Sequence, residues 1–390
     1  MKTYIKHTGI LALCIAFLTS CEPEDPLTGT TTTLECDYFN QDRVLVDDPD
    51  VSIDYLITCD MLVTADITIM PGVTIAFATD AGIQVQETGS FKAQGTAAQP
   101  ITFTGQDGVK GSWRGVIVYS NDPKNTFDHC VVEHAGGIAH NSNGDRGAFV
   151  VWAEGRLSLT NSTVTLSASH GLNATYRDAW LELGGNAFTQ NDGAPLYIDY
   201  DYVDVPSNTD DYTGNGITRI VLGDNGNHIS TNKTWKKVNV DYQVEGGSEL
   251  QVVQGAVLTV QPGVDVYFES GSSMRIRDES ALTAVGSSQL PIGMYGTTAA
   301  NGAWGGLYFT HTTNVQNVLD HVTVKYAGNT EFDGAIYMWA SPKLTVTNSE
   351  ISYSGSCAFF SGGSGTGVNP NLTVQNVTFS NNSGADYCED

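Results

Sequence analysis

Short apolar–polar alternations recur along most of the chain. In LTVQPGVDVYF (residues 258–268) and LTVTNSEIS (344–352), apolar residues occupy every second position until a Pro-Gly or Thr-Asn pair interrupts them. A period of two is that of a β-strand with one buried face. The segments recur roughly every 20–25 residues, which is the coil spacing of a parallel β-solenoid of about 14 coils. The pattern therefore predicts an all-β fold of stacked coils.

The chain is an internal duplication, broken by one unmatched stretch around residues 195–235. ADITIMPGVTIAF (65–77) returns as AVLTVQPGVDVYF (256–268), which places Pro71 on Pro262, a shift of 191 residues. Because both copies keep the same strand pattern, we expect one continuous solenoid of two halves. Further matched pairs are Trp113 with Trp304, 127–137 with 319–329, and 149–167 with 336–354.

The order of these motifs resembles a known family. The series LTVxPGVxVxF, G(T/S)xxxPI, WxG(L/V) and (L/F)DHxxVxxAG is similar to the right-handed parallel β-helix repeat proteins found among surface lipoproteins of Bacteroidetes-type bacteria. The resemblance spans about residues 50–390 and implies the halves 36–214 and 215–390. It says little of function, because this fold hosts lyases, hydrolases, adhesins and binding proteins. A pair of β-sandwiches would also give short strands, but the motif order favours the solenoid.

The first twenty residues are predicted to be a targeting segment. Lys2 and Lys6 precede an apolar run at 9–18 that is too short to span a bilayer comfortably. The run ends in LTSC, which resembles a bacterial lipoprotein signal in which Cys21 becomes the acylated first residue. The alternative is an ordinary secretory peptide with an incidental cysteine. We expect residues 1–20 to be removed.

A polar, flexible tether is expected over residues 21–35. Its first part, EPEDPLTGTTTT, places Glu22, Glu24 and Asp25 beside the lipidation site. Such acidic residues resemble the export signal that sends lipoproteins of these bacteria to the outer face of the outer membrane. The expected location is thus the bacterial outer membrane, lipid-anchored and facing the exterior.

Charge restricts the possible partners. The chain has 43 acidic and 18 basic residues, and loss of residues 1–20 removes two lysines and no acid, which leaves 16 bases and a net charge of −27. A field of that sign repels nucleic acid, anionic lipid surfaces and acidic polymers. Ca²⁺ is a natural complement, and it is the one cofactor that the composition suggests.

Five cysteines remain after the targeting segment and Cys21. Exported proteins permit disulfides, and two pairs lie close enough in sequence to staple the two ends of the domain. Spacing alone does not prove a pairing. The candidate pairs are Cys36 with Cys59 and Cys357 with Cys388, which leaves Cys130 as a buried thiol.

An Asp–His pair in FDHCVVEHAGG (127–137) suggests acid–base or metal chemistry. The pair Asp128–His129 recurs in LDHVTVKYAGN (319–329), but Glu133 is replaced there by a lysine. A catalytic site needs a fixed set of converging groups. The pair is therefore interpreted as a repeated turn-and-strand element.

The unmatched stretch supplies the candidate binding residues. It alternates tyrosine with aspartate, and residues absent from one copy are free of the packing rule of the repeat. Aromatic faces can stack on sugar rings, and carboxylates can bind hydroxyl groups or Ca²⁺. An ordinary strand with one wet face would give the same alternation. The candidates are Tyr197, Asp199, Tyr200, Asp201, Tyr202, Asp204, Asp210, Asp211 and Tyr212.

The tryptophans fall into two groups, those with a counterpart in the other copy and those without one. Those that are duplicated are predicted to pack, and those without a twin are better candidates for exposed stacking. The first group is Trp113, Trp304, Trp152 and Trp339, and the second is Trp180 and Trp235.

No convincing catalytic set emerges, so the expected function is non-catalytic: glycan binding, adhesion, or an accessory role beside other outer-membrane proteins. The alternative is a polysaccharide lyase or glycoside hydrolase of the pectate-lyase-like β-helix type, since a lyase needs a base beside a cationic group. The candidate bases would be Lys236, Lys237, Arg275 and Arg277.

Overall fold

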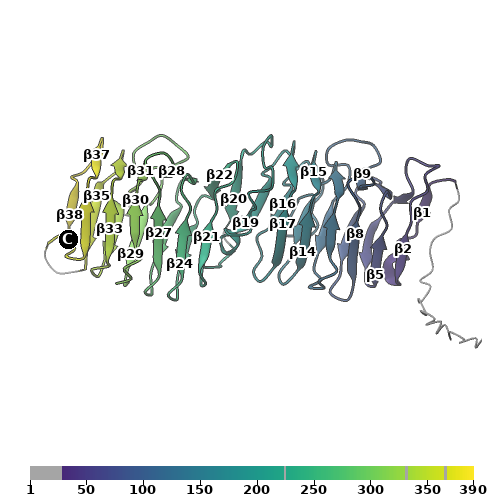
Figure 1. Ribbon diagram of the computed structural model, residues 1–390, viewed down its shortest axis with the longest axis horizontal. Helices are drawn as coiled ribbons and strands as arrows, with labels where there is room; N and C mark the ends of the chain where they lie inside the picture. Colours follow the sequence, from purple (N-terminus) through teal and green to yellow (C-terminus); the bar gives the residue numbers. More distant parts are fainter. Residues whose placement is uncertain (1–28, 224, 330–332, 364–366) are drawn as a thin grey trace, which may run out of the picture.

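The computed structural model describes residues 29–223, 225–329, 333–363 and 367–390. They form a right-handed parallel β-helix of about 14 turns, as predicted (Figure 1). All strand pairs among these residues are parallel, which excludes the β-sandwich alternative. Each coil contributes strands to three sheets, and the coils stack along one long axis.

In the first half, two short sheets and part of a long one enclose the core. We name them sheets A, B and C. Sheet A contains β2 (Arg43–Leu45), β5 (Asp66–Ile69), β8 (Ser90–Gln94), β11 (Thr126–Asp128), β14 (Arg156–Thr160) and β17 (Trp180–Gly184). Sheet B contains β1 (Thr32–Leu34), β3 (Tyr55–Ile57), β6 (Thr74–Phe77), β9 (Ile101–Gly105), β12 (Cys130–Glu133), β15 (Thr163–Thr165) and β18 (Ala187–Thr189).

Sheet C runs through both halves without a break. Its strands in the first half are β4 (Asp60–Val63), β7 (Gly82–Val85), β10 (Val116–Val118), β13 (Phe149–Val151), β16 (Leu172–Ala174) and β19 (Leu196–Asp199). It continues through β20 (Arg219–Gly223), β22 (Asp241–Val244), β25 (Asp265–Phe268), β28 (Ile292–Gly296), β31 (Val322–Lys325), β34 (Glu350–Ser352) and β37 (Thr378–Ser380). One sheet thus joins the two copies into one solenoid.

Two further sheets, D and E, complete the second half. Sheet D contains β23 (Glu249–Val252), β26 (Ser273–Ile276), β29 (Leu307–Thr310), β32 (Gly334–Trp339), β35 (Cys357–Gly362) and β38 (Tyr387–Glu389). Sheet E contains β21 (Lys233–Trp235), β24 (Val257–Val260), β27 (Ala281–Val285), β30 (Val318–Asp320), β33 (Leu344–Thr347) and β36 (Leu372–Gln375). Short 3₁₀ turns lie at η1 (Tyr38–Asn40) and η2 (Tyr200–Tyr202).

The second copy is rotated about the long axis of the solenoid relative to the first, so that equivalent strands of the two copies lie on different faces. By the 191-residue shift, β6 of sheet B corresponds to β25 of sheet C, and β7 of sheet C corresponds to β26 of sheet D. Equivalent strands of the two copies therefore do not continue each other's sheets. The turn takes place in the unmatched stretch, where sheets A and B end and an isolated bridge from Ile229 to Val252 begins sheet D.

The core is filled by the inward apolar rows, and the twin tryptophans Trp113 and Trp304 anchor them. Both indoles are fully buried, and each stacks on a phenylalanine, Phe77 or Phe268, with ring centroids 4.0 Å apart. The indole N–H of Trp113 donates to the Glu133 carbonyl at 2.8 Å. The prediction that this duplicated pair packs is confirmed.

Buried polar residues at equivalent positions of successive coils are hydrogen-bonded to one another, and we call each such series a polar ladder. The ladders hold the coils in register. In one ladder the Asn191 side chain accepts a hydrogen bond from the Ser167 backbone N–H at 3.0 Å, and Asn215 accepts one from the Asn191 N–H at 3.1 Å. Each step joins residues 24 apart, one coil length. Ser162, Asn186 and Asp210 form a second ladder of the same kind. These bonds satisfy backbone groups at corners where strand pairing stops.

The Asp128–His129 pair is structural, as interpreted from its twin. The Asp128 carboxylate accepts hydrogen bonds from Thr160 Oγ1 and Asn161 Nδ2 of the next coil, both at 2.8 Å. His129 has a φ of 50°, a left-handed conformation that turns the chain between sheets A and B. The second-half counterparts are Asp320, His321, Thr347 and Asn348, with the same bonds at 2.7 and 2.8 Å.

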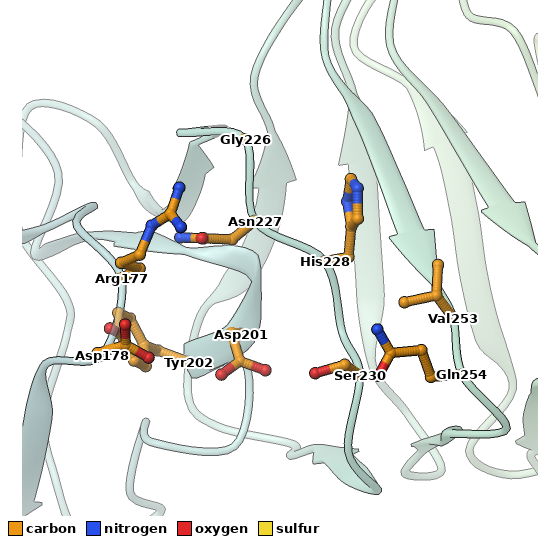
Figure 2. Close-up of a pocket in the computed structure, with 10 residues that line it drawn as sticks. All are labelled: Arg177, Asp178, Asp201, Tyr202, Gly226, Asn227, His228, Ser230, Val253 and Gln254. Atoms are coloured by element: carbon orange, nitrogen blue, oxygen red, sulfur yellow. The ribbon is translucent and has the colours of Figure 1, made fainter.

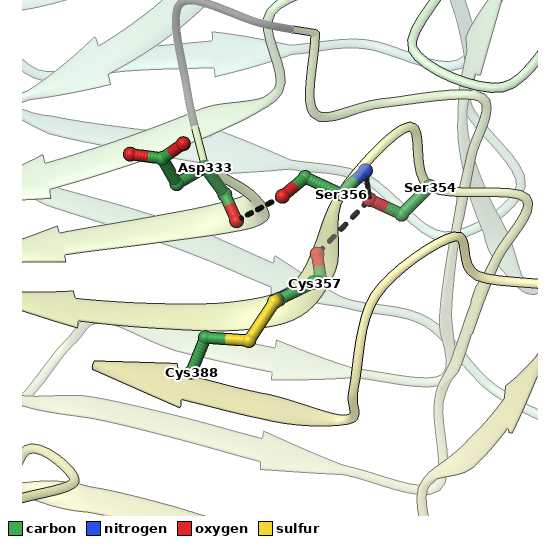
Figure 3. Close-up of a disulfide and its surroundings, with 5 residues drawn as sticks. All are labelled: Asp333, Ser354, Ser356, Cys357 and Cys388. Carbon is green, nitrogen blue, oxygen red and sulfur yellow. Dashed lines mark hydrogen bonds between the residues drawn. A yellow bond between two sulfur atoms is a disulfide. The ribbon is translucent and has the colours of Figure 1, made fainter. Parts of the chain in front are cut away.

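Two disulfides lie near the two ends of the solenoid, as predicted. They join Cys36 to Cys59 and Cys357 to Cys388. Figure 3 shows the second, which ties β35 to the last strand, β38. Beside it the Ser354 hydroxyl donates to the Cys357 carbonyl at 2.9 Å. The predicted buried thiol, Cys130, is 1% exposed, and burial raises its pKa.

The solenoid begins inside the stretch that was predicted to be a tether. Strand β1 pairs with β3, so residues 32–34 already belong to sheet B. Cys21 and the remainder of the predicted signal lie outside the described residues. In the part of the chain that the structure describes, no helix is long and apolar enough to cross a membrane.

Candidate functional site

A polar pocket of about 420 Å³ lies on the outer face of sheet C in the first half. The segment 136–147, which links β12 to β13, supplies one wall, and β16 and β19 supply the floor. The wall is fixed by Tyr176, whose hydroxyl donates to Asp145 at 2.7 Å and accepts from Asn143 at 2.9 Å. We call this the polar pocket, and its main lining residues are Asp145, Arg146, His170, Asn173, Tyr176 and Tyr197.

Three titratable groups in this pocket, His170, Tyr176 and Tyr197, are held in their neutral forms. Burial lowers the pKa of His170 to about 4, and its Nδ1 accepts the Ala194 N–H at 3.1 Å, which leaves Nε2–H as a donor. Burial and the Glu245 carboxylate raise the pKa of Tyr197, whose hydroxyl donates to Glu245 at 2.9 Å. Burial also raises the pKa of Tyr176 to about 12. The pocket therefore offers hydrogen-bonding groups rather than an activated base.

An aromatic pocket of about 480 Å³ adjoins it on the preceding coils. We define it by Glu87, Tyr119, Asn121, Trp152 and Glu154. The half-buried Tyr119 and Trp152 follow β10 and β13 directly, and their ring centroids are 5.7 Å apart.

Trp152 connects the two pockets. Its ring lies against that of Tyr176 on the next coil, with centroids 3.9 Å apart. Tyr119, Trp152 and Tyr176 thus form an aromatic row that crosses three successive coils, with one pocket on each side of the Trp152–Tyr176 contact.

A junction pocket of about 260 Å³ follows where the two copies meet (Figure 2). Arg177 and Asp178 reach it from the segment after β16, and Asp201 and Tyr202 reach it from η2. His228 and its neighbours, from the segment after β20, form the opposite side. Burial raises the pKa of Asp201, although Lys233 lies 3.6 Å from its carboxylate.

Two arginines at these pockets are uncommitted. Arg146 lines the polar pocket and Arg177 the junction pocket, and both are exposed. Neither guanidinium group has a hydrogen bond or ion pair with another residue that the structure describes. The remaining arginines of the described chain contact an acid, an amide or an aromatic ring, as Arg275 does with Glu249 at 2.7 Å. The pockets therefore carry unpaired donors in an otherwise acidic protein.

Three of the nine candidate residues line pockets. Tyr197 lies in the polar pocket, and Asp201 and Tyr202 lie in the junction pocket. Tyr202 is only 6% exposed, and its hydroxyl is bound to the backbone of Tyr176 and Ala179 at 2.6 and 2.8 Å. Its ring is therefore not available for stacking, and the stacking role predicted for it is wrong.

Four further candidates are buried structural residues, which corrects their prediction as ligand-binding groups. Tyr200 is fully buried, because the alternation ends at η2 and its ring turns into the core. Tyr212 is also fully buried, and its ring stacks on Phe188 with centroids 5.7 Å apart. Asp199 caps η2 by accepting the Asp201 N–H at 2.9 Å. Asp210 ends the Asn186 ladder and accepts the Tyr212 hydroxyl at 2.8 Å.

The last two candidates, Asp204 and Asp211, lie at the surface, where their carboxylates contact other side chains of this chain. Asp204 pairs with Lys233 at 3.4 Å, and Asp211 accepts hydrogen bonds from Thr213 and Asn239. Neither lines any of the three pockets. Within the described residues there is no group of three or more His, Cys, Asp or Glu side chains that could hold a metal ion, so no Ca²⁺ site can be assigned there.

The candidate lyase bases do not meet at a pocket. Arg275 pairs with Glu249 and Arg277 with Asp278, and Lys236 and Lys237 lie between β21 and β22. None of the four lines the three pockets described above.

The tryptophan predictions were partly wrong. Trp235 is fully buried although it has no twin, while Trp180 is 41% exposed as expected. Trp152 and its twin Trp339, predicted to pack, lie at the surface, with Trp339 36% exposed. The position of Trp152 could have been inferred from the sequence, since it follows an apolar strand of three residues and so begins the corner.

Neither a family model, nor a curated protein, nor a solved structure matches this chain. The function is therefore inferred from the pockets themselves.

Proposed function

We propose that this protein binds a neutral glycan chain, without catalysis, along sheet C of the first half. The glycan lies parallel to the solenoid axis, over the aromatic row and into the polar pocket. The same protein is anchored to the outer membrane through Cys21 and faces the exterior, where such chains occur.

The contact between Trp152 and Tyr176 carries this proposal. It joins an aromatic pocket to a hydrogen-bonding pocket across successive coils. Sugar rings present apolar C–H faces and hydroxyl edges, so a chain of them requires alternating aromatic and polar contacts. Coils stacked about 4.8 Å apart repeat such contacts along an extended ligand.

Charge favours a neutral ligand over an acidic one. Among the described residues, the surroundings of the aromatic and polar pockets include the carboxylates of Glu87, Glu154, Asp145 and Glu245, against one unpaired guanidinium, that of Arg146. The net charge of the chain, −25, adds a long-range field that repels polyanions.

Replacement of Trp152 by alanine should weaken glycan binding at this first-half site about 30-fold. Loss of an aromatic side chain at the centre of a binding site costs about 2 kcal/mol of binding free energy, and each 1.4 kcal/mol changes the affinity by a factor of ten. Titration calorimetry of residues 22–390 with cellohexaose, xylohexaose, mannohexaose and hexagalacturonate measures the effect.

The matched control is Trp180→Ala, since Trp180 is a surface tryptophan, 41% exposed, that stacks against the Arg156 guanidinium on sheet A, away from the pockets. It should bind as the wild type does. The proposal is overturned if no neutral hexasaccharide binds, or if Trp152→Ala binds as many ligands per chain as the wild type, with unchanged affinity at each site. Turnover of hexagalacturonate to an unsaturated product would establish a lyase instead.

The membrane anchor is tested separately. Cells that express the full chain should incorporate labelled palmitate into it, and Cys21→Ser should abolish the label, because the acyl chain needs the thiol. The control is Cys130→Ser, which removes a buried thiol and should keep the label. Persistent labelling of the Cys21→Ser protein would contradict the proposal.

A further inference from the structure

The tryptophan of the aromatic pocket, Trp152, has a counterpart on another side of the molecule. Trp152 on sheet C recurs in the sequence as Trp339, which ends β32 on sheet D. Because the second copy is turned by one face, the two tryptophans do not line one continuous groove. They lie on different faces of the rod, in different halves.

The surroundings of Trp339 form an outward aromatic cluster. Tyr308, Tyr337 and Phe360 are register partners on β29, β32 and β35, so they form one row across three coils. The Tyr337 ring stacks on Phe360 with centroids 5.1 Å apart and lies parallel to Trp339 within 8°. At the other end the Arg275 guanidinium lies 4.4 Å from the Tyr308 centroid.

In the first half the positions equivalent to Tyr308 and Tyr337 hold aliphatic residues. They are Ile117 and Val150, both fully buried. Segment 136–147 runs beside them and bonds to Arg114 and Asn173. The matching segment of the second half, 328–334, has seven residues instead of twelve.

The two copies thus differ in a consistent way. The first half pairs its longer segment with aliphatic residues, and the second half combines a shorter segment with partly exposed tyrosines. If the outward rows served only to pair strands, aliphatic residues would suffice in both halves. The tyrosines provide ring surface and hydroxyl groups together, the chemistry that binds sugars.

We propose that Tyr308, Tyr337 and Trp339 form a second glycan-binding surface on sheet D, so that one chain binds two neutral glycan chains on two faces and cross-links them. This inference rests on the proposed function of the first half. The duplication then supplies two sites, and the rotation at the junction keeps them from competing for one ligand strand.

Stoichiometry and cross-linking test this directly, with the neutral hexasaccharide that binds the wild type best. Calorimetry should give two ligands per wild-type chain, one for Trp152→Ala, one for Trp339→Ala, and at least a tenfold loss at both sites in the double variant. With the corresponding polymer, light scattering should rise for the wild type and stay at the baseline for either single variant.

The controls separate binding from folding. Tyr353→Ala removes an equally exposed aromatic residue that follows a sheet C strand, and it should retain both sites. Trp339→Phe keeps an aromatic ring and should bind more strongly than Trp339→Ala, even if the alanine variant is less stable. One ligand per wild-type chain, with Trp339→Ala unchanged, overturns this inference and leaves the proposed function intact. A wild type that binds no neutral glycan overturns both.

Discussion

Replacement of Trp113 by alanine should lower the free energy of unfolding by about 3–5 kcal/mol, the range for large-to-small changes of buried aromatic residues. The indole is fully buried, stacks on Phe77 and donates to the Glu133 carbonyl. Its removal leaves a cavity in the first half and an unpaired carbonyl. Guanidinium unfolding followed by far-UV circular dichroism measures the loss.

The duplication provides a matched experiment. Trp304 is buried to the same extent, stacks on Phe268 at the same distance, and donates to the Lys325 carbonyl at 2.9 Å. Trp304→Ala should therefore cost about as much as Trp113→Ala, while the exposed Trp180→Ala should change stability by less than about 0.5 kcal/mol. A loss below about 1 kcal/mol at Trp113 would show that its packing does not hold the coils. Because solenoids can unfold in parts, the unfolding curve of each variant is fitted with a separate transition for each half.

Replacement of Asn191 by alanine should lower the free energy of unfolding by about 2–6 kcal/mol, because two buried backbone groups lose their partners at about 1–3 kcal/mol each. The Asn191 side chain accepts the Ser167 N–H at 3.0 Å and donates to the Val164 carbonyl at 3.1 Å. It also bonds to Asn215, so the change interrupts a ladder across three coils. Urea unfolding of residues 22–390 gives the value.

The exposed Asn208→Ala variant is the control for Asn191, since no hydrogen bond of the Asn208 side chain would be lost, and its unfolding midpoint should match the wild type. A second variant, Asn191→Asp, keeps the acceptor for Ser167 but places a buried carboxylate oxygen against the Val164 carbonyl and the Asn215 amide oxygen, and should be destabilised at least as much as the alanine variant. Equal stability of all three proteins would refute the role of the ladder.

The repeat made the fold and several contacts predictable. Inward and outward positions follow from the period of two, as the buried Val322 and Val324 and the half-buried Lys325 illustrate. Comparison of the two copies identified Asp128–His129 as structural, because its neighbours change while the pair does not. The disulfides followed from two isolated cysteine pairs at the ends of the domain.

The binding residues were harder to predict because they lie where the period stops. At η2 the chain leaves the strand, so the alternation of Tyr200 and Tyr202 with aspartate no longer separates an inner from an outer face, and both rings turn inward. Trp152 lies at a corner between strands. A residue there can be present in both copies and still be exposed, so its duplication did not show that it packs in the core. Its partner Tyr176 comes from another coil, 24 residues further on, and no local pattern connects them.

The sequence by itself determined the strand period, the number of coils, the duplication and the residues of the apolar rows, because each depends on local alternation and on self-similarity. Only the tertiary structure decided which faces the two copies present. That the second copy is turned by one face depends on how the unmatched stretch packs between them, and no residue pattern records this rotation. The aromatic row, the polar pocket and the cluster around Trp339 arise from stacking between coils, since their members meet only when separate turns of the chain lie side by side.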